Sequence, residues 1–312
     1  MTNHKVTKKT IIGFMVGFCI LLMIVCIPFY SYTSKGYQFI EVNQKNKMIN
    51  KEKENSLDVL FLGDSECWAA FSPIQLFGEY GIASYNCATP GQWTGDTVAV
   101  LKHALKKQKP SVMILETSTL YSYPNHKKYL LSQTIPVFHY HYVLKNFKQK
   151  FGGAHMKGAN ILDTTVPYTG SLDYMSSSTA VLPLDSLSQD YLTEILQICK
   201  DNNITLLMVT SPSALNWTEG KHKTVDAWCT QHQITYIDYN EKDEIQKISI
   251  DWSTDTRDGG DHLNLSGSKK ITSDIGKYLS KNFSLTDHRN EEKYAEWAKT
   301  YAGSKLYHEG KK

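Results

Sequence analysis

Five short apolar segments alternate with helical patterns along most of this chain of 312 residues. They cover approximately residues 57–63, 82–87, 111–116, 204–210 and 234–238. Continuous apolar strands are typical of parallel sheets buried on both faces, and helices supply the crossovers between parallel strands. The pattern therefore predicts an α/β fold: a flavodoxin-like, doubly wound sandwich around a five-stranded parallel sheet.

The segments between these strands have helical periodicity. Residues 97–109 place Val98, Leu101 and Leu105 on one face, and Pro110 then stops the helix. Further helices are predicted at residues 67–80, 189–202, 221–232 and 266–279.

A long insertion, residues 119–186, separates the third and fourth strands and is rich in tyrosine. Insertions at the carboxyl edge of such sheets often cover or shape a site. We expect either an aromatic cover for a carbohydrate or acyl group, or a helical subdomain with its own small core. Trp217, in the loop after the fourth strand, is expected either to wall the site or to pack.

An uninterrupted apolar run occupies residues 11–30. Twenty helical residues span roughly 30 Å, about the thickness of a bilayer core. The run is longer than the apolar region of a signal peptide, and no small-residue cleavage site follows it. We therefore expect a single-pass helix in the cell membrane. Lysines in residues 1–10 predict a cytoplasmic N-terminus and an extracellular location for the rest of the chain.

Composition divides the rest of the chain. Residues 31–56 are rich in Lys, Asn and Glu, which predicts a stalk. Residues 57–285 are predicted to form the folded domain, and residues 286–312 a charged tail that forms a surface helix.

A net charge of +3 without a basic stripe gives little support to nucleic-acid binding. The six cysteines form no C-x-x-C pair, which argues against zinc and dithiol sites.

The first strand ends at Gly63, and Asp64 and Ser65 follow it at the start of a helix. Open α/β sheets place reactive groups at the carboxyl ends of their strands. The helix N-terminus also supplies N–H donors and a positive dipole that stabilise an oxyanion. Ser65 is therefore a candidate nucleophile, provided that the fold brings a base to it.

The candidate base is His262, in a turn rich in Asp and Gly before the last predicted helix. A serine hydroxyl is a poor nucleophile unless a neutral imidazole takes its proton and a carboxylate orients that imidazole. Loops on one edge of one sheet can bring Ser65, His262 and an aspartate together.

Three motifs together resemble the SGNH/GDSL hydrolase superfamily over roughly residues 57–283: Gly63-Asp-Ser65, Asn86-Cys-Ala-Thr-Pro-Gly91 and Asp261-His262-Leu-Asn264. With its N-terminal anchor, the chain looks more like the membrane-tethered branch that works with membrane-bound O-acyltransferases. That branch includes the D-alanyl-transfer protein of teichoic-acid modification and alginate acetylation proteins. The resemblance implies that Ser65 is the nucleophile and His262 the base.

It also implies an oxyanion hole formed in part by the backbone N–H groups of Ser65 and Gly91. A glycine at position 91 suits this role, because a residue without a side chain lets the backbone approach a substrate closely.

Two positions depart from the superfamily pattern. The orienting aspartate of the superfamily lies three residues before the histidine, where this chain has Gly259. Asp258 can curl back through the Gly-Gly turn toward Nδ1 of His262, whereas Asp261 is expected to point away. We therefore prefer Asp258 and keep Asp261 as the alternative.

The second departure concerns the asparagine that normally follows the third strand. Here that strand ends in Glu116, Thr117 and Ser118. Gln92 and Thr117 are candidate donors to the oxyanion. Glu116 is expected to be a buried partner of a site group or a substrate contact.

These features predict an extracytoplasmic, serine-dependent O-acyltransferase or esterase that acts on a cell-envelope polysaccharide or teichoic acid. The expected partner is a membrane-bound O-acyltransferase. Two alternatives remain open: a hydrolytic deacetylase or esterase, and a catalytically silent scaffold of an acylation complex. No cofactor or metal is predicted. His139 and His141 are spaced for strand-like metal binding, but no third ligand is evident.

Overall fold

A computed structural model describes residues 7–33, 45, 47–122, 156–304 and 307. It contains two compact units, residues 1–40 with 124–150 and residues 41–123 with 151–312. Residues 123–155 of the predicted insertion, His139 and His141 among them, lie outside the described residues.

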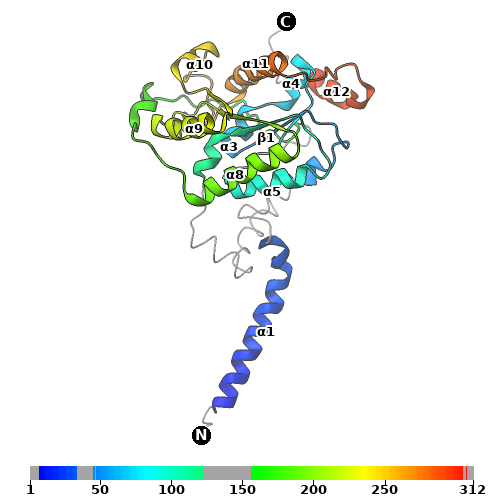
Figure 1. The fold of residues 1–312 in the computed structure, drawn as a ribbon, viewed down its shortest axis with the longest axis vertical. Helices are drawn as coiled ribbons and strands as arrows, with labels where there is room; N and C mark the ends of the chain where they lie inside the picture. Colours follow the sequence, from blue (N-terminus) through cyan, green and yellow to red (C-terminus); the bar gives the residue numbers. More distant parts are fainter. Residues whose placement is uncertain (1–6, 34–44, 46, 123–155, 305–306, 308–312) are drawn as a thin grey trace. The chain divides into compact units, whose positions relative to one another are not determined.

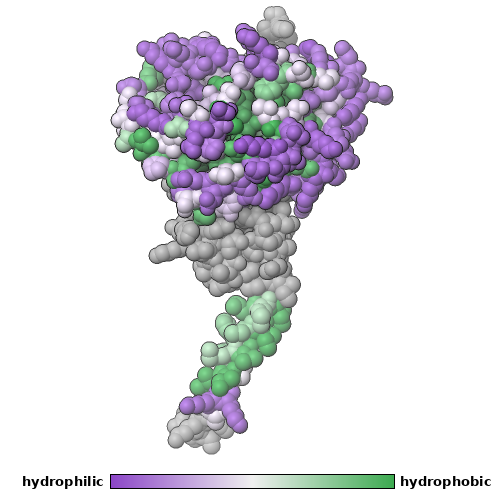
Figure 2. Space-filling model, in the orientation of Figure 1, coloured by the Kyte–Doolittle hydropathy of each residue, from purple (hydrophilic) through white to green (hydrophobic). Residues whose placement is uncertain are grey.

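The first unit contains helix α1 (Lys8–Thr33). By length and composition, the stretch from Lys8 to Val25 is apolar enough to cross a membrane, and none of it is buried inside the protein. Figure 2 shows apolar side chains exposed along this helix, whose side chains the structure describes as far as Val25. A helix that is apolar on all sides requires cover from lipid or protein. Its length and composition agree with the predicted membrane helix.

The second unit is built around a five-stranded sheet with the order β2-β1-β3-β4-β5 (Figure 1). All of the strand pairs are parallel, which confirms the predicted fold class. The strands are β1 (Val59–Leu62), β2 (Ser84–Asn86), β3 (Val112–Glu116), β4 (Thr205–Thr210) and β5 (Thr235–Asp238).

The two faces of the sheet carry separate apolar clusters. Alternate residues of one strand point to opposite faces, so Leu60 and Leu62 of β1 join one cluster and Val59 and Phe61 the other. Helices α5 (Thr94–Ala104), α8 (Ser186–Asp201) and α9 (Glu219–His232) contribute buried side chains to the first cluster. Helices α3 (Ser65–Ala70) and α11 (Leu265–Asn282) contribute to the second.

The helix predicted at residues 67–80 is two helices, α3 and α4 (Pro73–Tyr80). Pro73 occupies the first turn of α4, where the missing N–H costs nothing, and the Ser72 side chain accepts from the N–H of Gln75. The remaining helical elements are η1 (Thr117–Tyr121), η3 (Tyr174–Ser177), α10 (Lys242–Lys247), η4 (Glu292–Tyr294) and α12 (Ala295–Gly303).

The segment predicted as a charged C-terminal tail contributes to the core. Tyr294 and Trp297 are 3% and 4% exposed, and their rings lie 6.0 Å and 5.5 Å from that of Phe77 in α4. The predicted stalk also contributes, since Ile49 is buried in the same cluster. The folded domain therefore draws core residues from both flanking segments.

Gly63 connects β1 to the site. A Cβ at this position would lie 2.7 Å from Cβ of Cys67 and 2.8 Å from Cβ of Glu116. Real Cβ atoms do not approach so closely, so only glycine lets β1 enter α3 directly beside the carboxyl end of β3. This close approach sets the first turn of α3, with Ser65, against Glu116.

Candidate active site

Ser65 is the first residue of α3 and is half-buried. Asp64 caps the helix by accepting a hydrogen bond from the N–H of Glu66 at 3.3 Å. The hydroxyl of Ser122 in turn donates to Asp64 at 2.7 Å. The cap fixes the turn from which the Ser65 hydroxyl projects at the carboxyl edge of the sheet.

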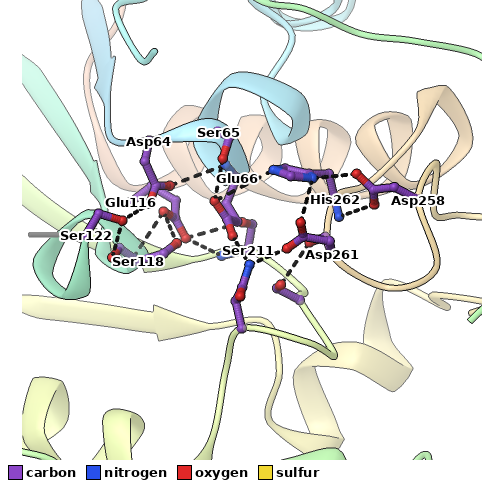
Figure 3. Close-up of polar contacts among 12 residues, drawn as sticks. Asp64, Ser65, Glu66, Glu116, Ser118, Ser122, Ser211, Asp258, Asp261 and His262 are labelled. Atoms are coloured by element: carbon purple, nitrogen blue, oxygen red, sulfur yellow. Dashed lines mark hydrogen bonds and ion pairs between the residues drawn. The ribbon is translucent and has the colours of Figure 1, made fainter. Parts of the chain in front are cut away.

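His262 reaches the same edge from the loop that precedes α11. Gly259 and Gly260 have φ angles of 80° and 102°, which side chains disfavour, and they let the loop turn back on itself. Asp258 accepts a hydrogen bond from the N–H of His262 at 2.7 Å. The second oxygen of Asp258 lies 2.6 Å from Nδ1 of the imidazole. One carboxylate thus holds both the backbone and the ring of His262 (Figure 3).

Asp261 also faces the imidazole instead of pointing away as expected. Its Oδ2 lies 3.3 Å from Nδ1 of His262, farther than the oxygen of Asp258. The amide of Asn216 donates to its other oxygen, and the Ser213 hydroxyl donates to its backbone carbonyl at 2.8 Å. Burial raises the pKa of Asp261, and Glu66 and Asp258 add to that effect.

Glu66 lies between the two predicted catalytic groups. Its side chain is 5% exposed. Oε2 accepts from the Ser65 hydroxyl at 3.1 Å and lies 4.0 Å from Nε2 of His262. In the part of the chain that the structure describes, no hydrogen bond joins Ser65 to His262, and Nε2 is buried without a hydrogen-bond partner. The serine and the histidine therefore meet through a carboxylate (Figure 3).

Neither Glu66 nor its partner Asn216 was predicted from the sequence. The amide of Asn216, in the loop after β4, donates to Oε1 of Glu66 at 2.6 Å. One available signal was a charged residue directly after the predicted nucleophile in a segment with apolar neighbours. Another was the position of Asn216 beyond a strand end on the predicted active edge.

Glu116 is a fully buried carboxylate at the end of β3. It accepts hydrogen bonds from the backbone N–H and hydroxyl of Ser118 and from those of Ser211, so it ties the loop after β3 to the loop after β4. Burial, together with the charge of Glu66, raises the pKa of Glu116 to about 8. Burial and the charges of Glu66 and Glu116 also raise the pKa of Asp64 well above its usual value.

The raised pKa of Glu116 predicts a pH-dependent stability. Between its usual pKa of 4.5 and about 8, the folded state keeps a proton that the unfolded state has lost. Stability should therefore fall as the pH rises through this range. Glu116→Gln cannot ionise, so its melting temperature is expected to decline less between pH 5 and pH 8. Glu194→Gln, a surface variant, is the matched control. An equal or steeper decline in Glu116→Gln would contradict the assignment.

The candidate oxyanion donors have different positions. Gly91 is exposed in the loop after β2, where its φ is 63°. It lies on the same edge of the sheet as Ser65 because β2 runs parallel beside β1. The Gln92 amide is used within its own loop, where its oxygen accepts from Thr89 at 2.9 Å and its nitrogen donates to Thr97 at 3.0 Å. The buried Thr117 hydroxyl pairs with that of Thr210. The side chains of Gln92 and Thr117 are thus engaged with other partners, while the role of the Gly91 N–H stays a prediction.

Lys221 of α9 brings a positive charge to this edge. Its Nζ lies 5.1 Å from the ring centre of Tyr121 and donates to the backbone carbonyl of Asn216. Burial lowers the pKa of Lys221, while the nearby carboxylates of Glu66, Asp64 and Glu116 oppose that effect.

Trp217, predicted either to wall the site or to pack, packs in the core, and its indole donates to Asp238 at 2.7 Å.

Glu66, Asp261 and His262 offer possible metal-ligand atoms within 4.8 Å of one another. The amide of Asn216 already donates to both carboxylates, so a hydrogen-bond donor occupies the position between them. We therefore do not assign these residues as metal ligands.

No family profile and no curated protein sequence matches the chain. Among solved structures, a GDSL-like lipase from Bacteroides thetaiotaomicron is 11% identical, with 78% of this chain and 98% of that chain covered and a TM-score of 0.41. A lipase/acylhydrolase from Enterococcus faecalis is 12% identical, with 74% and 99% covered and a TM-score of 0.40. An acetyl xylan esterase from Butyrivibrio proteoclasticus is 10% identical, with 73% and 64% covered and a TM-score of 0.30. Likenesses this distant assign no role to any residue.

Proposed function

We propose that this protein is a serine-dependent esterase or acyltransferase that works through an acyl-Ser65 intermediate. The observation that carries the proposal is the pairing of His262 with Asp258, whose Oδ2 lies 2.6 Å from Nδ1. This contact fixes the tautomer that leaves Nε2 as the working nitrogen. Nε2 is buried and faces the carboxylate that binds the Ser65 hydroxyl.

The chemistry follows from these groups. Ser65 Oγ attacks the carbonyl carbon of an ester while its proton passes to Nε2 of His262. The tetrahedral intermediate collapses, the imidazolium returns that proton to the leaving alcohol, and the acyl group stays on Oγ. A hydroxyl of an acceptor, or water, then attacks the acyl-serine while its proton passes to Nε2 of His262. The imidazolium returns that proton to Ser65 Oγ as the ester bond to the serine breaks. N–H groups at the first turn of α3 stabilise the oxyanion.

The finer proposal is an extracytoplasmic O-acyltransferase for a cell-envelope polysaccharide or teichoic acid, supplied by a membrane-bound O-acyltransferase. It is supported by α1, which is apolar enough to hold the chain at a membrane, and by the lysines that precede the apolar run. Water as the acceptor would make the protein a deacetylase or esterase. Polymer esters in a deletion strain distinguish the two, because loss of esters indicates a transferase and gain indicates an esterase.

A catalytically silent scaffold is a second candidate, and one observation favours it. The Ser65 hydroxyl donates to Glu66, and among the described residues it makes no hydrogen bond to His262. A scaffold would tolerate that arrangement, whereas a catalyst must exchange the Glu66 contact for one to Nε2.

Reaction with a fluorophosphonate tests the proposal, because this reagent modifies serines that a base activates. The protein should gain the mass of one phosphonyl group, and peptide mapping should locate that group on Ser65. Prior heat denaturation should prevent the reaction. Modification at another serine, or none after prolonged exposure between pH 6 and pH 9, would favour the scaffold.

A further inference from the structure

A cavity of about 940 Å³ lies among the segments that follow β4 and β5 at the carboxyl edge of the sheet. Its walls come from the η3 region, the first two turns of α9, the loop after β5 with α10, and the residues Ile250 and Trp252. Ligand pockets typically measure roughly 300–1,000 Å³, and open α/β sheets bind ligands at this edge. The cavity therefore has the size and the position of a ligand site.

Hydrogen bonds join the wall of this cavity to the loop that carries His262. Asn240, in the wall, accepts from the backbone N–H of Ser213 at 2.8 Å and from the Tyr174 hydroxyl at 3.0 Å. The Ser213 hydroxyl donates to the carbonyl of Asp261 at 2.8 Å. A polymer with one unit in the cavity is thus held beside the catalytic loop.

The lining combines an apolar wall with exposed polar groups. Trp252 and Tyr174 contribute to the wall, with their ring centres 5.4 Å apart and the rings at 83° to each other. Asp226 of α9 and Gln246 of α10 are exposed lining residues; both can accept hydrogen bonds, and the amide can also donate. A sugar ring matches this combination, because its C–H groups pack on apolar side chains and its hydroxyls both donate and accept.

Negative charge predominates in the lining. Four carboxylates and two lysines contribute to it: Asp173, Glu219, Asp226, Glu241, Lys223 and Lys242. Lys223 is paired with Glu219 at 2.7 Å. The imidazole of His222 lies 2.8 Å from the buried carboxylate of Asp238 and 3.6 Å from that of Glu241, so a positive charge on it is already matched. A polymer of phosphate groups would meet like charge here, whereas an uncharged sugar would not.

We propose that this cavity binds an uncharged sugar unit of the polymer that gains or loses the acyl group at Ser65. The inference rests on the proposed function, and it selects a polysaccharide over a teichoic acid as the substrate. The unit in the cavity anchors the chain, and a neighbouring unit presents its hydroxyl or its ester to Ser65. Asp226 and Gln246 are the expected hydrogen-bond partners of the anchored unit.

The test is saturation-transfer NMR on the full chain in phosphatidylcholine nanodiscs, which contribute no sugar headgroups. The probes are unacylated tetrasaccharides of N-acetylglucosamine, glucose, mannose and galactose, with a glycerol phosphate trimer as the anionic comparison. At least one tetrasaccharide should bind with a dissociation constant on the order of 1 mM. The glycerol phosphate trimer should bind at least about tenfold more weakly, because it meets like charge.

Two variants locate the binding. Asp226→Ala removes a hydrogen-bond acceptor from the cavity and should weaken the binding about three- to tenfold. Gln246→Trp places a large side chain in the cavity and should abolish it. Asp190→Ala, at an exposed position of α8 outside the cavity, is the matched control and should bind as the wild type does. Circular dichroism and melting temperature check that each variant folds; if Gln246→Trp does not fold, Asp226→Ala carries the test.

Failure of every tetrasaccharide to bind would overturn the inference. Equal binding of the glycerol phosphate trimer, or unchanged binding in the folded cavity variants, would also overturn it. Fluorophosphonate labelling of the same protein separates this result from the proposed function. Labelling at Ser65 without sugar binding would remove the sugar site alone, whereas sugar binding without labelling would remove the acyl-Ser65 mechanism and leave a sugar-binding cavity.

Discussion

Ser65→Ala is expected to lower the hydrolysis of an activated ester such as p-nitrophenyl acetate by about 10⁴- to 10⁶-fold. Without Oγ no acyl-serine can form, and His262 has no hydroxyl to activate. Residual turnover would come only from stabilisation of the oxyanion at the first turn of α3. Initial rates measure the loss, and the mass of the intact protein after mixing with substrate should show an acyl adduct in the wild type alone.

Ser280→Ala is the control for this variant. Ser280 is exposed on α11, where its hydroxyl donates to the carbonyl of Gly276 at 2.9 Å in the preceding turn. Its rate should match that of the wild type. If Ser65→Ala retained more than about a tenth of wild-type turnover while Ser280→Ala retained all of it, the acyl-Ser65 mechanism would be excluded.

The fold could be predicted because parallel strands leave a direct trace in the sequence. In β3, Val112 and Ile114 enter one apolar cluster while Met113 and Leu115 enter the other. A strand buried on both faces must be apolar at every position, so the sheet appears as separate apolar runs. Those runs gave the number of strands and the position of Ser65 at the end of the first.

The C-terminal segment could not be placed in the same way. In the sequence, Tyr294 and Trp297 are surrounded by charged residues. In the structure they are buried because both rings pack against Phe77 of α4. A short helix with two aromatic anchors has too little periodicity to indicate which surface it covers.

The catalytic candidates were predicted to different degrees. The strand end indicates Ser65, and the Gly-Gly turn indicates that Asp258 can return to His262. Local sequence does not reveal the Glu66 network, because Asn216 is 150 residues away from the carboxylate that it holds. Nor could it reveal that the Gln92 amide is fully used by Thr89 and Thr97 within its own loop. Which hydrogen-bond partner each of these side chains takes depends on the other donors and acceptors nearby, and these are brought together only when the loops pack.

Asp258→Asn is expected to slow ester turnover by about 10²- to 10⁴-fold, and Asp261→Asn by about tenfold or less. Both aspartates face Nδ1 of His262, but Asp258 lies at 2.6 Å and Asp261 at 3.3 Å. Asp258 also accepts from the N–H of His262, so it fixes the loop as well as the ring. An amide at position 258 can turn its NH₂ toward Nδ1 and favour the tautomer with the proton on Nε2, which cannot accept the serine proton.

The two variants are matched controls for each other, because each removes one carboxylate charge within the same loop. A general loss of negative potential would slow or accelerate both equally, whereas loss of the orienting contact affects Asp258→Asn alone. Initial rates from pH 6 to pH 9 make the comparison, together with melting temperatures that show both variants to be folded. If Asp261→Asn were the slower enzyme, Asp261 would be the orienting residue. Asp258 would then serve the site only by accepting the hydrogen bond from the backbone N–H of His262.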